Sequence, residues 1–187
     1  MKYFYMGVTA ELESASDREA VACIGDSLGR EFGLPLRAIG LPAIDFAYDA
    51  GRAQYASIPV LEMLLALCPA DGAKLLAVTA RDLFIPVLTF VFGHALLSGR
   101  AAVVSLARLR QEFYRLPADQ PIFVERAVKE ALHESGHMFG LVHCAERACA
   151  MSLSTGVRQI DGKRAAFCGP CTARLSRGRG AASKDLL

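Results

Sequence analysis

Three of the four histidines of this chain lie within eleven positions, in the segment HESGHMFGLVH, and this spacing constrains the fold more than any other feature. If the segment is helical, His133 and His137 lie one turn apart on one face and can both reach a single metal ion. Gly140 can adopt a positive φ, end the helix and turn the chain, so that His143 returns to the same ion. The spacing therefore predicts a helix, a glycine turn and a third ligand around one metal.

A glutamate next to the first histidine points to catalysis. Three neutral imidazoles leave one open position on a tetrahedral zinc ion, which is the arrangement of a catalytic site. Glu134 is rotated from His133 by about 100° around the helix axis, so it can lie beside the metal without binding it and take a proton from a water molecule that zinc acidifies. The alternative of ordinary helix and core residues is disfavoured, because a chain of this composition would give the pattern by chance in about one of a hundred thousand sequences.

Four cysteines form a second cluster of metal-binding residue types. They are arranged as two pairs, Cys144 with Cys149 and Cys168 with Cys171. Four thiolates make a closed tetrahedral zinc site without room for water. Residues 141–180 have few periodic apolar positions, so the free energy of metal binding would have to order them.

Two other interpretations of these cysteines remain open. CGPC at 168–171 also matches a thioredoxin-type redox dithiol, although such a motif belongs between a strand and a long helix of an early β-α-β unit. A zinc-ribbon module for nucleic acid is weaker, because no basic patch with interleaved aromatic residues accompanies the cysteines. Cys23 and Cys68 have no partners at ligand spacing and are predicted to be buried small apolar residues.

The rest of the chain predicts an α/β (α+β) fold. Strand patterns occupy 1–9, 34–42, 74–86, 89–97 and 100–109, and helix patterns occupy 14–33, 57–69 and 119–140. Ser16 or Asp17 is the expected N-cap of the first helix and Asp119 that of the third, while Ser98-Gly99 indicates a hairpin. Helices and strands alternate first, so we expect a mixed, mostly parallel sheet. The length fits a single domain, 1–187, with an N-terminal lobe at 1–140 and a C-terminal lobe at 141–187.

Composition argues against several classes of partner. The net charge of +2 is spread along the chain, so neither nucleic acid nor an acidic partner is indicated. The longest nearly apolar run, 83–97, is shorter than the roughly 20 residues of a membrane span, and the N-terminus lacks the hydrophobic region of a signal peptide. We therefore expect a cytoplasmic monomer that binds neither nucleic acid nor membrane. The basic end, 172–187, is predicted to be a frayed solvated tail, with weak contact to an anionic surface as the alternative.

The motif HExxHxxGxxHC, followed by C-x-M and CxxC over residues 133–171, resembles the archaemetzincin family of metzincin zinc peptidases; segments 49–57 and 79–93 are also similar. The resemblance implies a metzincin-type zincin fold with a twisted mixed sheet, an active-site helix and a small zinc-stapled C-terminal lobe. It also implies two Zn²⁺ per chain and Met151 in a Met-turn below the catalytic zinc. In the resemblance, His133, His137 and His143 bind the catalytic zinc, Glu134 is the base, and Cys144, Cys149, Cys168 and Cys171 bind the structural zinc.

Some metzincins add a tyrosine just beyond the Met-turn, but this chain has no tyrosine after Tyr114. Stabilisation of the oxyanion would then depend on zinc and other groups, for which His94 on the expected edge strand is a candidate, although a structural role is favoured.

Two functions from different classes follow. The first is a zinc-dependent peptidase that acts on short or restricted peptides, with aminopeptidase activity known for some relatives of the type it resembles. The second is a two-zinc binding or scaffold protein with little or no turnover. Glu134 favours the peptidase, because zinc binding requires no acid at that position whereas hydrolysis does.

Overall fold

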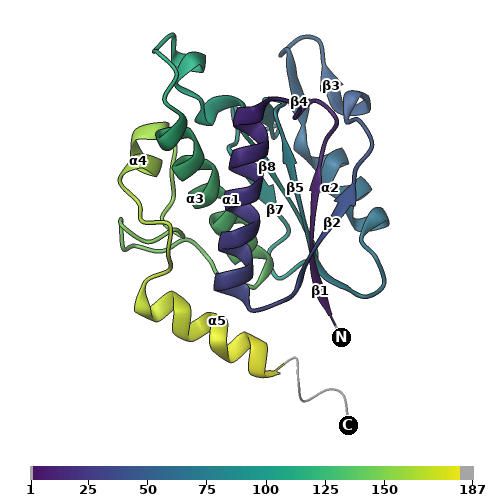
Figure 1. Ribbon diagram of the computed structural model, residues 1–187. Helices are drawn as coiled ribbons and strands as arrows, with labels where there is room; N and C mark the ends of the chain where they lie inside the picture. The colour runs from purple at the N-terminus through teal and green to yellow at the C-terminus, as the bar shows by residue number, and fades with distance from the viewer. Residues whose placement is uncertain (1, 182–187) are drawn as a thin grey trace.

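The computed structural model describes residues 2–181 and contains a five-stranded sheet with helices on both faces (Figure 1). The strands are β1 (Tyr3–Val8), β2 (Leu36–Gly40), β5 (Gly72–Thr79), β7 (Gly93–Ala95) and β8 (Ala101–Ser105), in the order β2-β1-β5-β8-β7. Strands β2, β1, β5 and β8 are parallel to one another, and β7 pairs antiparallel with β8 at one edge of the sheet. The predicted mixed, mostly parallel sheet is confirmed.

The two faces of the sheet are covered by different helices. Helices α1 (Ala15–Phe32) and α3 (Gln120–Met138) pack on one face, and α2 (Ser57–Leu67) packs on the other. Successive residues of β5 alternate between the two cores: Leu76 and Val78 lie on the α1 and α3 side, and Leu75 and Ala77 on the α2 side. Strand β5 therefore needs apolar residues at nearly every position, as a strand buried on both faces does.

The helix that carries the histidine pair begins and ends as predicted. The Asp119 side chain caps α3 by accepting a hydrogen bond from the Ile122 N–H at 3.0 Å. Gly140 has a φ of +85° just beyond the last turn. The cap predicted for α1 was wrong: the N-cap is Ser14, whose side chain and Asp17 form a reciprocal capping box, so Asp17 takes the third helical position.

Three of the predicted strands were too long, and the segment 100–109 gives only β8 to the sheet before a 3-10 helix begins at Ala107. The segment 74–86 divides at Thr79 into β5 and β6 (Leu83–Phe84), and β6 belongs to a separate three-stranded sheet with β3 (Tyr48–Asp49) and β4 (Gln54–Ala56). The polar turn TARD separates the two parts. The segment 89–97 contributes only β7 to the main sheet. Residues 85–92 instead form an irregular stretch with exposed Val87 and Leu88, which borders the cleft described below.

Residues 141–181 contain more regular structure than expected. Helix α4 (Val157–Asp161) and helix α5 (Gly169–Ala181) both lie there, and short 3-10 helices occur earlier at η1 (Asp45–Ala47), η2 (Ala107–Leu109) and η3 (Gln111–Tyr114). The predicted frayed tail is therefore wrong as far as Ala181. Cys171 and Leu175, one turn apart, are both buried and anchor α5. Residues 182–187 of that predicted tail lie outside the described residues.

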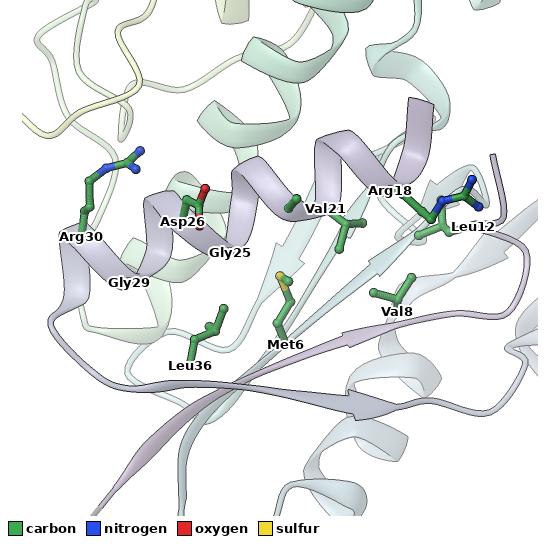
Figure 2. Close-up of a pocket in the computed structure, with 11 residues that line it drawn as sticks. Met6, Val8, Leu12, Arg18, Val21, Gly25, Asp26, Gly29, Arg30 and Leu36 are labelled. Atoms are coloured by element: carbon green, nitrogen blue, oxygen red, sulfur yellow. The ribbon is translucent and has the colours of Figure 1, made fainter. Parts of the chain in front are cut away.

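An open groove of about 790 Å³ runs between α1 and strands β1 and β2 (Figure 2). Its lining is mostly apolar, with Met6, Val8 and Leu36 on its floor and Arg18 and Arg30 toward its two ends. None of the predicted site residues lies in this groove. Among the described residues, no helix combines the length and apolar character that crossing a bilayer requires.

Candidate active site and metal centres

The three histidines of the motif converge, as the spacing predicted. His133 and His137 lie on α3, and the turn at Gly140 brings His143 back to them. The Nε2 atoms of His133 and His137 are 3.1 Å apart, and one ligand nitrogen from each of the three residues falls within a group no wider than 4.8 Å. Two nitrogens on one tetrahedral zinc ion are about 3.3 Å apart, given Zn–N bonds of roughly 2.0–2.1 Å. The geometry of the cluster therefore fits a zinc ion.

The hydrogen bonds of the two rings decide their tautomers. Nδ1 of His133 lies 2.8 Å from the carbonyl oxygen of Ala150, and Nδ1 of His137 lies 2.8 Å from that of Leu141. A carbonyl oxygen can only accept, so each Nδ1 carries the proton and each Nε2 presents a lone pair. Two lone pairs that face each other at 3.1 Å repel, and a cation between them removes the repulsion.

The imidazoles are held in the form that binds metal. Burial lowers the pKa of His133 well below its ordinary value, and it also lowers those of His137 and His143. The positive charge of Lys163 lowers the pKa of all three further. Neutral imidazole is the ligand form, so zinc would not have to displace protons near neutral pH.

Glu134 is buried beside the histidines and touches the edge strand. Burial raises its pKa well above the ordinary value; the neighbouring carboxyl of Glu130 raises it further, and Lys163 lowers it. A side chain at Gly93 on β7 would place its Cβ 2.5 Å from Cγ of Glu134. Only glycine at that position lets the carboxylate approach the strand so closely. Sequence reasoning did not single out Gly93, because the contact joins residues 41 positions apart.

Met151 lies where the histidine motif predicted a methionine. It is fully buried, and a Cβ at Gly136 of α3 would come within 2.4 Å of its sulfur atom. Met151 therefore packs against the helix between the two histidine-bearing turns. The residue before it, Ala150, supplies the carbonyl oxygen that orients His133. The backbone around Met151 thus packs against α3 and orients one ring of the histidine cluster.

The four cysteines also converge. One sulfur from each of Cys144, Cys149, Cys168 and Cys171 falls within a group no wider than 4.8 Å, and the Sγ atoms of Cys144 and Cys168 are 3.7 Å apart. Burial raises the pKa of the Cys171 thiol far above its ordinary value, and hydrogen bonds from neighbouring thiols raise it further. Four adjacent thiolates need a cation, and zinc binds four thiolates in this way. A redox dithiol needs only two of the four, so the convergence favours the metal interpretation of CGPC.

The two clusters are joined by the backbone. Cys144 follows His143 directly, and its N–H donates to the carbonyl oxygen of Met151 at 2.9 Å. Cys149 comes two residues before Met151, so the segment Cys149–Ala150–Met151 contacts both clusters. The remaining cysteines lie elsewhere: Cys23 and Cys68 are only half-buried, so the prediction that both are buried was wrong. Cys68 caps the end of α2, with its sulfur 3.3 Å from Nη2 of Arg100.

A cleft of about 520 Å³ lies between β7 and the histidine cluster. The three histidines and Glu134 line it, as do Glu130, the stretch 85–92 and the exposed side chains of Leu97, Val142 and Leu153. His94 also borders the cleft, and its Nδ1 is 2.9 Å from Oγ of Ser57, which in turn donates to the Phe84 carbonyl at 3.2 Å. The structure thus gives His94 a structural partner, as the favoured interpretation expected.

This combination defines a class of protein. A mixed sheet whose antiparallel edge strand borders a cleft, above a helix carrying HExxH and a third histidine beyond a glycine turn, is the arrangement of metzincin-type zinc metallopeptidases.

Comparison with known proteins identifies the family. A sequence model of peptidase family M54 matches residues 65–177. The archaemetzincin of Methanocaldococcus jannaschii is 42% identical over 138 residues, which cover 72% of this chain and 75% of the relative. The solved archaemetzincin of Methanopyrus kandleri superposes with a TM-score of 0.83 at 32% identity, covering 96% of both chains. A zinc-dependent peptidase from Methanocorpusculum labreanum gives a TM-score of 0.81 at 30% identity, covering 92% of this chain and 99% of that one. The chain belongs to peptidase family M54, the family of the archaemetzincins, and is a zinc metallopeptidase.

Proposed function

We propose that this peptidase hydrolyses short or restricted peptides with a catalytic zinc ion on His133, His137 and His143 and with Glu134 as the general base. The observation that carries the proposal is the pair of imidazole lone pairs facing each other at 3.1 Å beside Glu134. In this proposal residues 1–140 and 141–187 are two lobes of one domain, with the cleft between them.

Strand β7 is the proposed site for the peptide backbone. It lies at the edge of the main sheet, so the hydrogen-bonding groups on its outer side can pair with an extended peptide. The cleft of about 520 Å³ has room for only a few residues. The exposed Leu97, Val142 and Leu153 would contact apolar side chains of the peptide. Short peptides and unfolded segments are therefore the expected substrates, and a compact folded protein is not.

Proton transfer is assigned to Glu134. Zinc bound to the three imidazoles would supply a Lewis acid that polarises a carbonyl group and acidifies a water molecule. Glu134 accepts the proton of the attacking water and then donates it to the departing amine nitrogen. Its burial against Gly93 keeps the carboxylate at a fixed position and away from bulk water. Met151, in the proposed Met-turn, fixes the helix face below the histidines.

A second zinc ion is proposed at Cys144, Cys149, Cys168 and Cys171, where it would hold the C-terminal lobe against α3. This site is structural in the proposal, because four sulfur ligands fill a tetrahedral ion and leave no place for water. We further propose a cytoplasmic monomer, the expectation drawn from composition, which gel filtration would test for the oligomeric state.

Metal content and peptide cleavage together test the proposal. We expect two zinc ions per chain in the wild type and one in His137→Ala, with cleavage of a fluorogenic peptide library only by the wild type. Glu134→Gln should retain both zinc ions and lose hydrolysis. Free and N-terminally acetylated forms of each cleaved peptide would separate an aminopeptidase from an endopeptidase. Two zinc ions without cleavage of any peptide would instead favour the two-zinc scaffold.

A further inference from the structure

A buried ion pair joins the catalytic helix to the C-terminal lobe. Nζ of Lys163, just after α4, donates to Oε1 of Glu130 on α3 at 3.2 Å. Both residues are almost completely buried, with 4% of Lys163 and 3% of Glu130 exposed. Figure 1 shows α4 beside α3. Neither residue has a part in the hydrolysis proposed above.

The position of Glu130 on α3 places it with the reacting groups. Glu130, His133, Glu134 and His137 are spaced i, i+3, i+4 and i+7, so their side chains share one stripe of the helix. All four line the same cleft. Two carboxylates one turn apart therefore face one small volume, together with three uncharged imidazoles.

The charge of Lys163 acts across this whole volume. Its ammonium lies 3.2 Å from the carboxylate of Glu130, which lines the cleft one helical turn before Glu134. Because both charged groups are almost completely buried, solvent screens their field little, and it extends over the helix stripe that carries His133 and His137. An isolated ammonium there would repel a metal cation, and the Glu130 carboxylate at 3.2 Å cancels most of that repulsion.

The ion pair between Glu130 and Lys163 is not needed to attach the C-terminal lobe to α3. The same segment is already attached to α3 by Arg126, whose guanidinium donates to both carboxylate oxygens of Asp161 at 2.6 and 2.8 Å. Burying an ion pair gives little net stability compared with apolar side chains of the same size. A pair of opposite charges directly beside a metal site can instead set the electrostatic potential at that site.

We propose that Glu130 and Lys163 are positioning residues that form a charge-compensated pair, which sets the electrostatic potential at the histidine site so that Glu134 is the single uncompensated carboxylate beside the metal. The inference rests on the proposed histidine metal site. It assigns the pair no contact with the substrate or the metal.

The proposal predicts that the two single variants change the metal affinity in opposite directions. Glu130→Gln leaves an uncompensated ammonium and should weaken metal binding at the histidine site about tenfold, whereas Lys163→Met leaves an uncompensated carboxylate and should strengthen it by a similar factor. The double variant Glu130→Gln/Lys163→Met restores neutrality and should return to within about threefold of wild type. Lys163→Arg keeps the charge and should bind as the wild type does.

Titration with Co²⁺ of protein that keeps zinc at the cysteine site and has lost metal only from the histidine site measures these affinities, and the absence of thiolate-to-cobalt charge-transfer absorption shows that the cysteine site has not exchanged. The matched control is Asp71→Asn, which removes the carboxylate of the ion pair between Arg37 and Asp71, neither of which lines the cleft. Its affinity should not change. Thermal unfolding of each variant with zinc at the cysteine site shows that it is folded, and Lys163→Gln removes the same charge if Lys163→Met does not fold.

Weakening in both single variants without recovery in the double variant would overturn the inference, because that is the behaviour of a purely structural clamp. Equal affinities in all variants would overturn it as well. These failures differ from failure of the proposed function. If the wild type binds Co²⁺ at the histidine site and cleaves peptides, the absence of a sign reversal counts against the pair alone. Binding with the sign reversal but without cleavage counts against the peptidase alone.

Discussion

Different interactions stabilise the two lobes of this protein. The N-terminal lobe has two apolar cores on either side of a sheet, and the first of them also takes in Ala150, Ile160 and Leu175 of the C-terminal lobe. The separate apolar cluster of the C-terminal lobe has four buried members, Leu141, Cys149, Met151 and Cys171, and two of these are proposed metal ligands. Burial of apolar surface is distributed over many residues, whereas a metal site depends on each ligand. Single substitutions should therefore have very unequal effects in the two lobes.

The largest effect is expected from Cys171→Ser. Loss of one sulfur ligand should release the proposed structural zinc, whose binding contributes on the order of 10 kcal/mol in small zinc modules. Amide hydrogen exchange should then show lost protection in 141–177 with protection retained in β5, and peptide cleavage should disappear. Cys23→Ser is the control, since Cys23 lies outside both clusters. Unchanged protection in 141–177 would show that packing alone orders this lobe.

Leu76→Ala tests the N-terminal lobe. Leu76 is fully buried between the sheet and the helices α1 and α3, so the cavity should cost about 3 kcal/mol. We expect a lower melting temperature, the metal content of the wild type, and a normal rate of cleavage below the transition. Loss of metal together with stability would contradict the view that the two lobes are stabilised independently.

Gly93→Ala tests the contact between the edge strand and the proposed base, Glu134. The added Cβ would lie 2.5 Å from Cγ of Glu134, so the carboxylate must move. Misplacing a general base should lower kcat about 100-fold, while zinc content and melting temperature change little. The control is Gly29→Ala on α1, where an added Cβ meets open space. Unaltered turnover in Gly93→Ala would exclude Glu134 in its present position as the base.

The smallest effect is expected from substitution of Glu11, which makes polar contacts within the N-terminal lobe. Burial would raise its pKa, but hydrogen bonds from Thr79 at 2.5 Å and Thr9 at 2.6 Å, with the charge of Arg81, lower it below its ordinary value of 4.5. A lowered pKa in the folded state stabilises the protein above about pH 4.5, and this stabilisation is lost as the pH falls through the lower, folded-state value.

Glu11→Gln should therefore cost about 1 kcal/mol at pH 7, a value reduced for the partial exposure of the carboxyl group. The difference from wild type should diminish as the pH falls below about 4.5. Urea unfolding at a series of pH values measures it. A constant difference across that range would show that the effect is one of packing.

The features that were predicted correctly are those that short spacings encode. The i, i+4 histidines, the Asp119 cap and the Gly140 turn belong to one continuous segment, so local geometry was sufficient to predict α3 and the histidine cluster. The convergence of the four cysteines was predicted because four thiolates have only a few possible arrangements around one ion. The structure brings together every residue predicted for the two clusters.

The errors and omissions concern contacts between distant segments. Strand β6 has the apolar character of β5 but leaves the main sheet, because it pairs with β4. Helix α5 has a polar, glycine-containing sequence and forms because Cys171 and Leu175 are buried by the rest of the protein. Nothing in the local pattern could indicate that Lys163 meets Glu130 or that Gly93 meets Glu134, since those pairs are separated by 33 and 41 positions.

The backbone segment Cys149–Ala150–Met151 has a consequence for biosynthesis. If each cluster holds its metal as proposed, this segment is positioned by one ion and orients a ligand of the other through the Ala150 carbonyl. The last two sulfur ligands, Cys168 and Cys171, are translated after every histidine of the chain. A chain still on the ribosome would therefore lack a finished catalytic centre even after α3 has formed, and peptidase activity would begin only after Cys171 has been translated and has reached the other three cysteines.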